Sequence, residues 1–308
     1  MNTRSASLNG QVILITGAAS GIGAATAVEL RGRGALPVLV DCDPAGLQVS
    51  AQATGGDPLT LVADVTSLAQ CEAAVAGALA RHGRIDVVWA NAGMASFGPL
   101  SHTDPAAWNH CIDVNVKGVF HTVRAALPAV LASRGYVLAT ASAASFAHPP
   151  LMSAYAASKA AVEAMCNAWR LELAAHGVPV GVIHASWVKT PMVDEGRLHP
   201  GFARLGKTMP AMMRAEMPVQ EAARRIADGI EARASRIWLP GWVRLLHWLR
   251  ALLHTPTAER ALRRAAPELE ALYLEGLAAE GVIASSYGPR ERERALARLR
   301  DARGAHGG

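Results

Sequence analysis

Residues 11–23 read QVILITGAASGIG, a short apolar run followed by three closely spaced glycines. The β-branched, apolar run predicts a buried strand of a parallel sheet. Ala-rich sequence to about residue 32 predicts a helix directly after the glycines. A strand, a glycine turn and a helix in this order point backbone amides of the helix N-terminus at a phosphate group. In such a turn Gly17 permits the tight bend, Gly21 lets a pyrophosphate approach, and Gly23 lets the helix pack on the strand.

A second apolar run, residues 36–40, predicts the next strand, which ends at Asp41. An acidic side chain about 20 residues beyond such glycines can bind the 2′-hydroxyl of an adenosine ribose. Neither Cys42, the next residue, nor Ser20, inside the glycine turn, carries the positive charge that a 2′-phosphate would need. The sequence therefore favours NAD over NADP as the cofactor.

Apolar runs alternate with helical patterns along the rest of the chain. Further strands are expected at residues 59–63, 87–90, 136–140, 178–184 and 236–239, and helices at residues 71–82, 108–132 and 155–176. This alternation predicts an α/β fold, a doubly wound (Rossmann) parallel sheet with helices on both faces. Ligands bind such sheets outside the carboxyl ends of the strands. The residues expected at those ends are Gly17, Asp41, Asp64, Asn91, Ser142 and the segment 185–190.

A second motif, Tyr155-Ala-Ala-Ser-Lys159, lies at the start of a predicted helix. Its tyrosine and lysine stand four residues apart, so both side chains project from one helical face. A phenol has an unperturbed pKa of about 10 and is a poor acid or base at neutral pH. An ammonium one turn away favours the phenolate, so we expect Lys159 to lower the pKa of Tyr155. The pair is a candidate general acid/base.

Six motifs occur in order over roughly residues 8–241: Thr16-Gly17-x-x-x-Gly21-x-Gly23, Asp64, Asn91-Ala92-Gly93, Asn115, Ser142 and Tyr155-x-x-x-Lys159. With Ser142 placed 13 residues before Tyr155, the chain resembles the short-chain dehydrogenase/reductase family, in its compact, non-extended branch. The resemblance implies that Tyr155 exchanges a proton with the substrate oxygen, which Ser142 holds. It also implies that Lys159 hydrogen-bonds the nicotinamide ribose, and that Asn115 anchors a water that relays protons through Lys159.

The resemblance implies a cofactor site as well. That site would comprise Gly17, Ser20, Gly21, Ile22, Gly23, Asp41, Asp64, Val65, Asn91, Ala92, Gly93, Tyr155, Lys159, Val188 and Thr190. The chain departs from the family after the sixth expected strand, where Ala185-Ser186 replaces the usual Pro-Gly and Trp187 follows. We expect Trp187 to narrow the site. Ser145 is a rival to Ser142, but its spacing of 10 from Tyr155 fits less well.

Bulk composition restricts the remaining classes of function. The 308 residues are 51% apolar and 18% charged, which suits a well-packed globular enzyme. The net charge of +5 is spread along the chain, so we expect no nucleic-acid surface. The four cysteines lack Cys-x-x-Cys spacing, so we expect neither a metal site nor a disulfide framework. We find no secretory signal and no membrane-spanning run, and therefore expect a cytoplasmic protein.

We expect an NAD-dependent alcohol dehydrogenase or ketone reductase that acts on a small lipophilic secondary alcohol or ketone. Methionines crowd residues 192–218, the expected substrate lid, and suit an adaptable apolar wall. One alternative is an extended-type sugar epimerase or dehydratase, although that form usually spaces its glycines as Gly-x-x-Gly-x-x-Gly. Another is a non-catalytic NAD-binding regulator, which would have no need of a tuned tyrosine.

The resemblance further implies a homodimer or homotetramer whose faces are the helices of Asn115 and Tyr155. Four residues on the second of these helices suit either internal packing or a subunit seam: Val162, Met165, Cys166 and Trp169. A symmetric assembly is expected because most soluble oligomers are symmetric homo-oligomers.

Beyond the catalytic domain, residues 1–241, the sequence predicts a helical C-terminal extension, residues 242–308, with a charged, frayed end from Glu291. Within residues 242–253 and just beyond, one helical stripe is polar: Arg244, His247, Arg250 and His254. We call these four residues the polar stripe and expect them to face water, with a wide apolar face opposite. That face could pack on this chain, on a neighbouring subunit or on a membrane surface. The few cations weaken attraction to lipid, which favours packing on protein.

Overall fold

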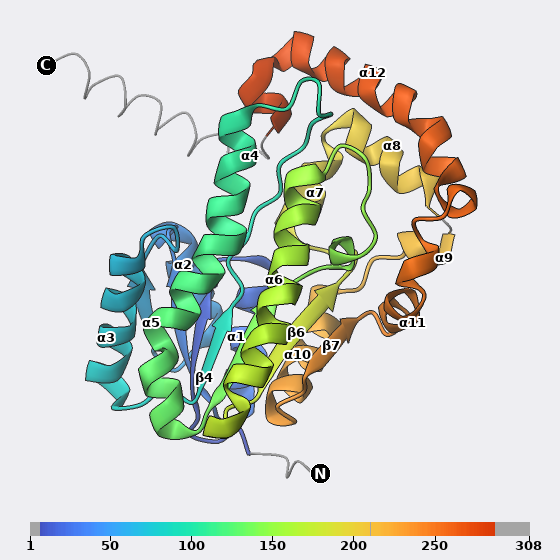
Figure 1. The fold of residues 1–308 in the computed structure, drawn as a ribbon. Coiled ribbons are helices and arrows are strands. Elements are labelled where there is room, and N and C mark those ends of the chain that lie inside the picture. The colour runs from blue at the N-terminus through green and yellow to red at the C-terminus, as the bar shows by residue number, and fades with distance from the viewer. Residues whose placement is uncertain (1–6, 210, 287–308) are drawn as a thin grey trace, which may run out of the picture.

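Seven parallel strands form a single sheet in the order β3-β2-β1-β4-β5-β6-β7 (Figure 1). The computed structural model describes residues 7–209 and 211–286 of the chain. The strands are β1 Val12–Thr16, β2 Leu36–Asp41, β3 Leu59–Val62, β4 Val87–Ala90, β5 Tyr136–Thr140, β6 Val180–Ala185 and β7 Arg236–Leu239. The strand order reverses direction between β1 and β4, which opens a crevice at the carboxyl ends. The predicted doubly wound α/β sheet is confirmed.

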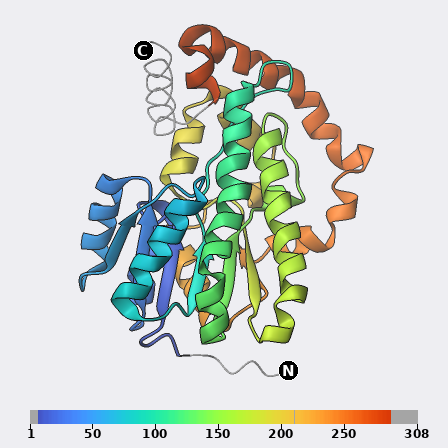
Figure 2. The same ribbon diagram turned by 60° about the vertical axis from the view of Figure 1, so that its left-hand side comes forward.

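Helices cover both faces of this sheet and give a three-layered molecule (Figure 2). One face packs under α3 Leu68–His82, α5 Gly118–Ser133 and α6 Ser153–Glu172, and the other under α1 Gly21–Gly32, α2 Pro44–Thr54 and α10 Val219–Glu231. Successive strand residues alternate between the two cores, as Leu14 and Ile15 do. Because both faces are buried, the central strands read as continuous apolar runs.

The helix expected over residues 108–132 is not continuous. It consists of α4 Pro105–Ile112, a π-helical turn Asp113–Lys117, and α5. The amide of Gly118 bonds the carbonyl of Asp113, one residue further than in an α-helix. Other boundaries also moved: α3 starts at Leu68, the sixth strand starts at Val180, and α6 ends at Glu172, before a 3-10 turn Ala174–His176.

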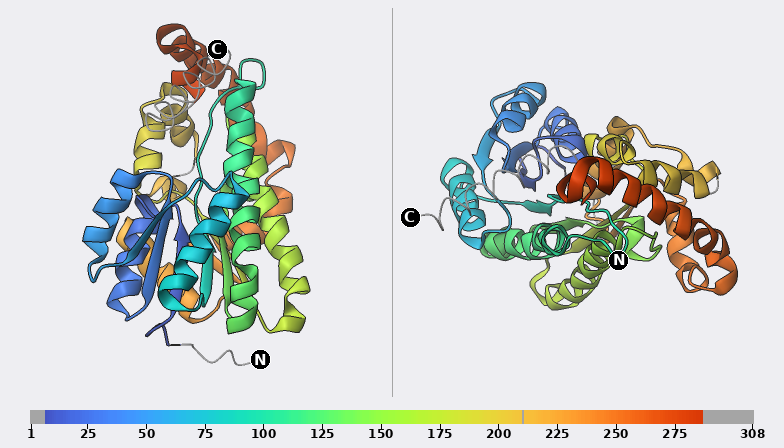
Figure 3. Two further views of the ribbon diagram at one scale, coloured as in Figure 1. Left: turned by 90° about the vertical axis from the view of Figure 1, so that its left-hand side faces the viewer. Right: turned by 90° about the horizontal axis from the view of Figure 1, so that it is seen from above.

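Three short helices span the segment expected to be the lid, a role that stays a prediction: α7 Pro191–Arg197, α8 Pro200–Thr208 and α9 Ala211–Arg214. The long helix α12 Pro256–Ser286 crosses the carboxyl end of the sheet and packs on α8 (Figure 3). Leu269 of α12 is fully buried in a cluster with Phe202 and Leu205 of α8. The division of the chain at residue 241 stays a prediction, but α12 and the lid share this apolar cluster. The expected frayed end beyond Glu291 lies outside the described residues.

The segment after β7 folds as two short pieces, α11 Val243–Trp248 and a 3-10 turn Arg250–Leu252. Its expected orientation holds only in part, since Arg244, Arg250 and His254 are exposed as expected and Val243 is fully buried. His247 of the polar stripe faces inward, 3.0 Å from the buried carboxylate of Glu163, whereas Leu245 and Trp248 are exposed. A buried carboxylate is costly without positive partners, so His247 and the guanidinium of Arg250 are drawn toward Glu163. Within the described part of the chain, no helix is both long and apolar enough to cross a membrane.

Candidate active site

The turn after β1 requires glycine at two positions. Gly17 has φ +68°, and a Cβ added to it would lie 2.7 Å from the Cα of Ala92. A Cβ on Gly23 would lie 2.3 Å from the carbonyl oxygen of Gly17. Helix α1 therefore starts closely packed on the turn, with its N-terminal amides directed at the crevice. This is a cradle into which a diphosphate fits.

The side chain of Asn91 holds this turn in place. Its Nδ2 donates to the carbonyls of Thr16 and Gly17 at 3.1 and 3.2 Å, and its Oδ1 accepts from Thr140 Oγ1 at 3.1 Å. One amide thus ties together the ends of β1, β4 and β5. The expected Asn91-Ala92-Gly93 motif has a structural role that spacing alone did not reveal.

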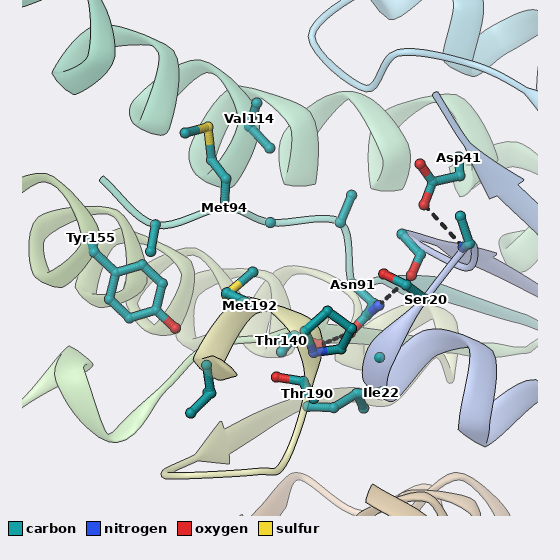
Figure 4. A pocket seen from close by; sticks show the side chains of 18 of the residues that line it. Ser20, Ile22, Asp41, Asn91, Met94, Val114, Thr140, Tyr155, Thr190 and Met192 are labelled. Atoms are coloured by element: carbon teal, nitrogen blue, oxygen red, sulfur yellow. Dashed lines mark hydrogen bonds between the residues drawn. The ribbon is translucent and has the colours of Figure 1, made fainter. Parts of the chain in front are cut away.

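The adenosine end of the crevice carries fixed negative charge. Asp41 accepts the backbone N–H of Ala19 at 3.0 Å and that of Asp43 at 3.1 Å (Figure 4). Asp64 is held on its Oδ1 by the amide and hydroxyl of Thr66, at 2.9 and 2.8 Å. Asp41, Asp43 and Asp64 all line the crevice, and Lys159, at the other end, is the one lysine or arginine among its lining residues.

The structure gathers nearly all of the expected cofactor residues in one pocket. Those that line it are Gly17, Ser20, Gly21, Ile22, Asp41, Asp64, Val65, Asn91, Ala92, Gly93, Tyr155, Lys159, Val188 and Thr190. Gly23 lies behind the turn instead, where it permits the packing described above. The replacement of Pro-Gly by Ala185-Ser186 leaves both residues lining the pocket. Trp187 does not narrow it, because its ring packs on Phe202 of α8 at 5.4 Å between ring centres.

Tyr155 and Lys159 project from the first turns of α6 into a water-poor interior. Burial raises the pKa of Tyr155, and a hydrogen bond with Ser142 opposes that rise. Lys159 Nζ lies 5.7 Å from the centre of the Tyr155 ring and donates to the carbonyl of Thr140 at 2.9 Å. Burial lowers the pKa of Lys159 to about 8. In the protein alone desolvation dominates and the pKa of Tyr155 is raised overall, so the expected lowering of that pKa by Lys159 stays a prediction.

The two candidate serines have distinct partners. Ser142 donates to the carbonyl of Ala185 at 3.1 Å and hydrogen-bonds Tyr155. Ser145 donates to the carbonyl of Lys159 at 3.0 Å, inside the fold. The contact with the phenol is what a residue that holds a substrate oxygen requires, and Ser142 has it. Ser145 instead anchors the start of α6.

Asn115 lies in the π-helical turn and is fully buried. Its Oδ1 accepts from the amide of Met94, and its Nδ2 donates to the carbonyl of Met94 and to Ser158 Oγ, all at 2.9 Å. These bonds use the side chain to fix the loop after β4 against α6. The water-anchoring role stays a prediction. Because the side chain of Asn115 is already bonded within the protein, the backbone of the π-helical turn is the part that would hold such a water.

The opposite end of the pocket, around Tyr155, has a largely apolar wall. It is formed by Met94, Ala95, Phe97, Val114, Met192 and Val193, with His110 and Glu195 among them (Figure 4). Sequence reasoning missed Met94, Phe97 and Val114, although Met94 directly follows Asn91-Ala92-Gly93. Of the crowded methionines in residues 192–218, Met192 lines the pocket, while Met217 lies in the core beneath the sheet.

Comparison with known proteins decides the family. A family profile described as short chain dehydrogenase matches residues 11–200. The chain is a short-chain dehydrogenase/reductase. Its similarity to the (-)-trans-carveol dehydrogenase of Rhodococcus erythropolis is 38% identity over 207 residues, or 61% of this chain and 75% of the relative.

Two further proteins extend the similarity over more of this short-chain dehydrogenase/reductase. An uncharacterized NAD-dependent oxidoreductase of Mycobacterium tuberculosis is 31% identical over 265 residues, 78% of this chain and 93% of the relative. A short-chain dehydrogenase/reductase from Burkholderia phymatum, solved in complex with NAD, superposes with a TM-score of 0.72 at 27% identity, covering 81% and 97% of the two chains. The protein is accordingly an NAD(P)-dependent oxidoreductase of this family.

Proposed function

We propose that this short-chain dehydrogenase/reductase uses NAD(H) to interconvert a lipophilic secondary alcohol and its ketone. The proposal rests on one pocket with two unlike ends, a carboxylate-rich end beyond the glycine turn and an apolar end around Tyr155. At the apolar end, Ser142 hydrogen-bonds Tyr155, and these two hydroxyl groups provide a place for a reacting oxygen.

The choice of NAD over NADP follows from charge. The carboxylate of Asp41 is fixed by two backbone amides at the pocket edge, and Asp43 stands beside it. A ribose with a free 2′-hydroxyl can donate to such a carboxylate. A 2′-phosphate would face two carboxylates, and no arginine or lysine stands among the described residues that line this end.

The protein's own groups then carry the proton. Bound NAD⁺ would accept the hydride that leaves the carbinol carbon. Ser142 holds the alcohol oxygen, and the oxygen of Tyr155, as phenolate, takes the hydroxyl proton as the carbonyl forms. Lys159 Nζ, held by the carbonyl of Thr140 at 2.9 Å, lies 5.7 Å from the centre of the Tyr155 ring, so its positive charge acts on the phenol from a fixed position. Asn115 and Lys159 are almost inaccessible, whereas Tyr155 is half-buried and lines the pocket, where a substrate can reach it.

The apolar wall suggests the class of substrate. Met94, Phe97, Val114 and Met192 form most of the wall at the reacting end, where Lys159 is the one lysine or arginine among the described lining residues. An alicyclic secondary alcohol fits this wall, and a charged sugar nucleotide does not. The relative from Rhodococcus erythropolis carries the name of such an alcohol, carveol.

The two alternatives predict different behaviour. A sugar epimerase or dehydratase would recycle its cofactor and produce no net NADH, and its usual glycine spacing is absent here. A non-catalytic regulator would bind NAD without turnover, but Ser142, Tyr155 and Lys159 are all retained around the pocket.

The test is NADH formation with purified protein and a panel of alicyclic and acyclic secondary alcohols, with sugar nucleotides as controls. We expect turnover of the alicyclic alcohols, and faster turnover with NAD⁺ than with NADP⁺ at equal, subsaturating concentration. Turnover of sugar nucleotides alone, or cofactor binding without any turnover, would refute the proposal.

A further inference from the structure

A cluster of charged side chains fixes the orientation of the segment after β7. Glu163 of α6 is buried, and its Oε1 lies 3.0 Å from His247 Nε2, 3.3 Å from Arg250 Nη1 and 3.7 Å from Arg236 Nη1. His254, just beyond, bonds the carbonyl of Phe146 at 3.2 Å. Most of the polar stripe is therefore used as an anchor to the protein. We call Glu163, His247 and Arg250 the clasp.

The clasp makes the opposite orientation costly. Turning the segment over would leave the carboxylate of Glu163 buried with fewer positive partners, a strongly unfavourable state. The ring of His184 lies near Glu163 and His247, so three side chains of the kinds that bind metal ions are grouped here. Two guanidinium groups already balance this carboxylate, however, so a metal cation would be repelled there. The cluster acts as an anchor, and the apolar side of the segment is held outward.

That outward side is an exposed apolar face. Its members are Leu245, Trp248, Leu249 and Leu252, with 60%, 79%, 42% and 58% of their surfaces accessible. We call these four residues the docking face. Large apolar side chains grouped in this way on a folded surface mark an interaction site. Tryptophan is enriched where protein meets the headgroup region of a bilayer.

The charge around the docking face distinguishes between possible partners. Residues 242–264 contain five exposed arginines, Arg244, Arg250, Arg260, Arg263 and Arg264, and one acidic residue, Glu259. That glutamate is bonded to Arg263 at 2.8 Å. Five arginines against Glu259 give the segment a net charge of +4 without its histidines, or +3 once Glu163, which Arg250 balances, is included. In a two-fold interface, a second copy would set the same arginines against one another.

We propose that the docking face binds an anionic lipid surface. Apolar residues that enter the interface beside a set of arginines are the features of a membrane-surface helix. The segment begins at the carboxyl end of β7 and continues into α12 (Figure 1). The pocket also lies at the carboxyl ends of the strands. Docking would therefore bring the lid side of the molecule toward the lipid phase. The proposal does not depend on the identity of the substrate.

The test is co-sedimentation of the full-length protein with vesicles of phosphatidylcholine and phosphatidylglycerol. We expect the wild-type protein to pellet with these vesicles, to pellet at least tenfold less with phosphatidylcholine alone, and to be released by high salt. Trp248→Ser/Leu252→Ser should lower the bound fraction about tenfold and retain turnover. The matched control is Val49→Ser/Val62→Ser, which removes two exposed apolar residues near the opposite edge of the sheet. It should bind like the wild type.

Two results would overturn the proposal. One is wild-type protein that stays in the supernatant with anionic vesicles, or that binds them equally after Trp248→Ser/Leu252→Ser. The other is a lower molecular mass of Trp248→Ser/Leu252→Ser than of the wild type by light scattering, when neither protein binds vesicles. That result would assign the docking face to a second copy of the chain. Circular dichroism and thermal melting of both double variants check that neither result comes from unfolding.

Discussion

At the scale of single residues, burial disfavours the charged forms of both Tyr155 and Lys159. Burial raises the pKa of Tyr155 and lowers that of Lys159 to about 8. The hydrogen bond with Ser142 is the protein's own contribution toward the phenolate. A positive charge brought close to the phenol, as an oxidised nicotinamide carries, would favour the phenolate further. We infer that Tyr155 becomes ready to accept a proton only when the oxidised cofactor is bound.

Tyr155→Phe is expected to lower kcat by about 10²- to 10⁴-fold, since the phenol supplies the acid/base step. The ring remains in place, so NADH affinity, measured by fluorescence titration, should be nearly unchanged. Ser145→Ala is the control, because it removes a buried hydroxyl of the same site that bonds the Lys159 carbonyl instead of the phenol. Near-wild-type turnover of Tyr155→Phe would contradict the mechanism.

Asp41→Ala/Cys42→Arg is expected to shift the preference from NAD toward NADP. The change removes a carboxylate that repels a 2′-phosphate and adds a guanidinium that binds one. The measurement is the ratio of kcat/KM for the two cofactors. Cys42→Ser alone serves as control and should leave the ratio unaltered. If the wild-type protein already prefers NADP, the role assigned to Asp41 is wrong.

His184 should make stability depend on pH. It is fully buried and stacks on Trp238 at 4.7 Å, and burial lowers its pKa to about 4. The pKa of histidine in the unfolded chain is about 6.5, so as pH falls the unfolded chain binds the proton first. Stability is therefore lost between about pH 6.5 and pH 4, by up to roughly 3 kcal/mol.

Urea unfolding at pH 7 and near pH 4.5 would measure this loss. His184→Phe retains a ring beside Trp238 but cannot bind a proton, so its stability should change less between the two pH values. An equal pH dependence in wild type and variant would show that other groups control it.

At the scale of elements, regular patterns were predictable and local departures from them were not. The strands and the crevice at their carboxyl ends followed from alternating apolar runs and from Gly17, Gly21 and Gly23. The π-helical turn was missed because its cause is the non-local set of bonds between Asn115, Met94 and Ser158. Such bonds leave no periodic signal in a sequence.

The inward position of His247 in α11 was missed for a related reason. A helical pattern separates a polar side from an apolar side, but it does not reveal a buried carboxylate elsewhere in the chain. Glu163 lies more than 80 residues before its partners His247 and Arg250. The need to balance that buried charge draws His247 inward, beside the fully buried Val243 of the apolar side.

Leu269→Ala should weaken the packing of α12 on α8. Leu269 is fully buried, and the loss of such a side chain costs about 2–5 kcal/mol. Glu268→Gln, one residue away, is the control. Glu268 is half exposed and paired with Arg204 at 2.6 Å, so its loss should cost at most about 1 kcal/mol. Thermal unfolding would compare the two, and equal losses would contradict the apolar origin of this contact.

At the scale of the whole molecule, the expected assembly remains a proposal, and the structure narrows where its faces could lie. Val162 and Cys166 are fully buried in the core, with Met165 and Trp169 packed against them. Val162 and Cys166 thus serve internal packing, while the partly buried Met165 and Trp169 leave the subunit seam a prediction. Phe120 lies on α5, in the long helix expected around Asn115, and is 46% exposed. It is therefore an apolar candidate for a contact between subunits.

Phe120→Glu is expected to reduce the molecular mass measured by light scattering at micromolar concentration. We propose a symmetric homo-oligomer, in which a charge at an apolar contact would repel its own copy. Val49→Glu, on an exposed position of α2, should leave the mass unchanged. A wild-type monomer would refute the proposed assembly.

The contact of α12 with the lid also has a consequence for the order and speed of events in a catalytic cycle. Gly196 of α7 borders the pocket and packs closely on the ring of Phe202 in α8, which in turn rests on α12. For a product to leave past α7, this stack of helices must move as a body. Motions of packed helices take microseconds to milliseconds. We therefore expect release, governed by a segment remote from the reacting atoms, to limit turnover.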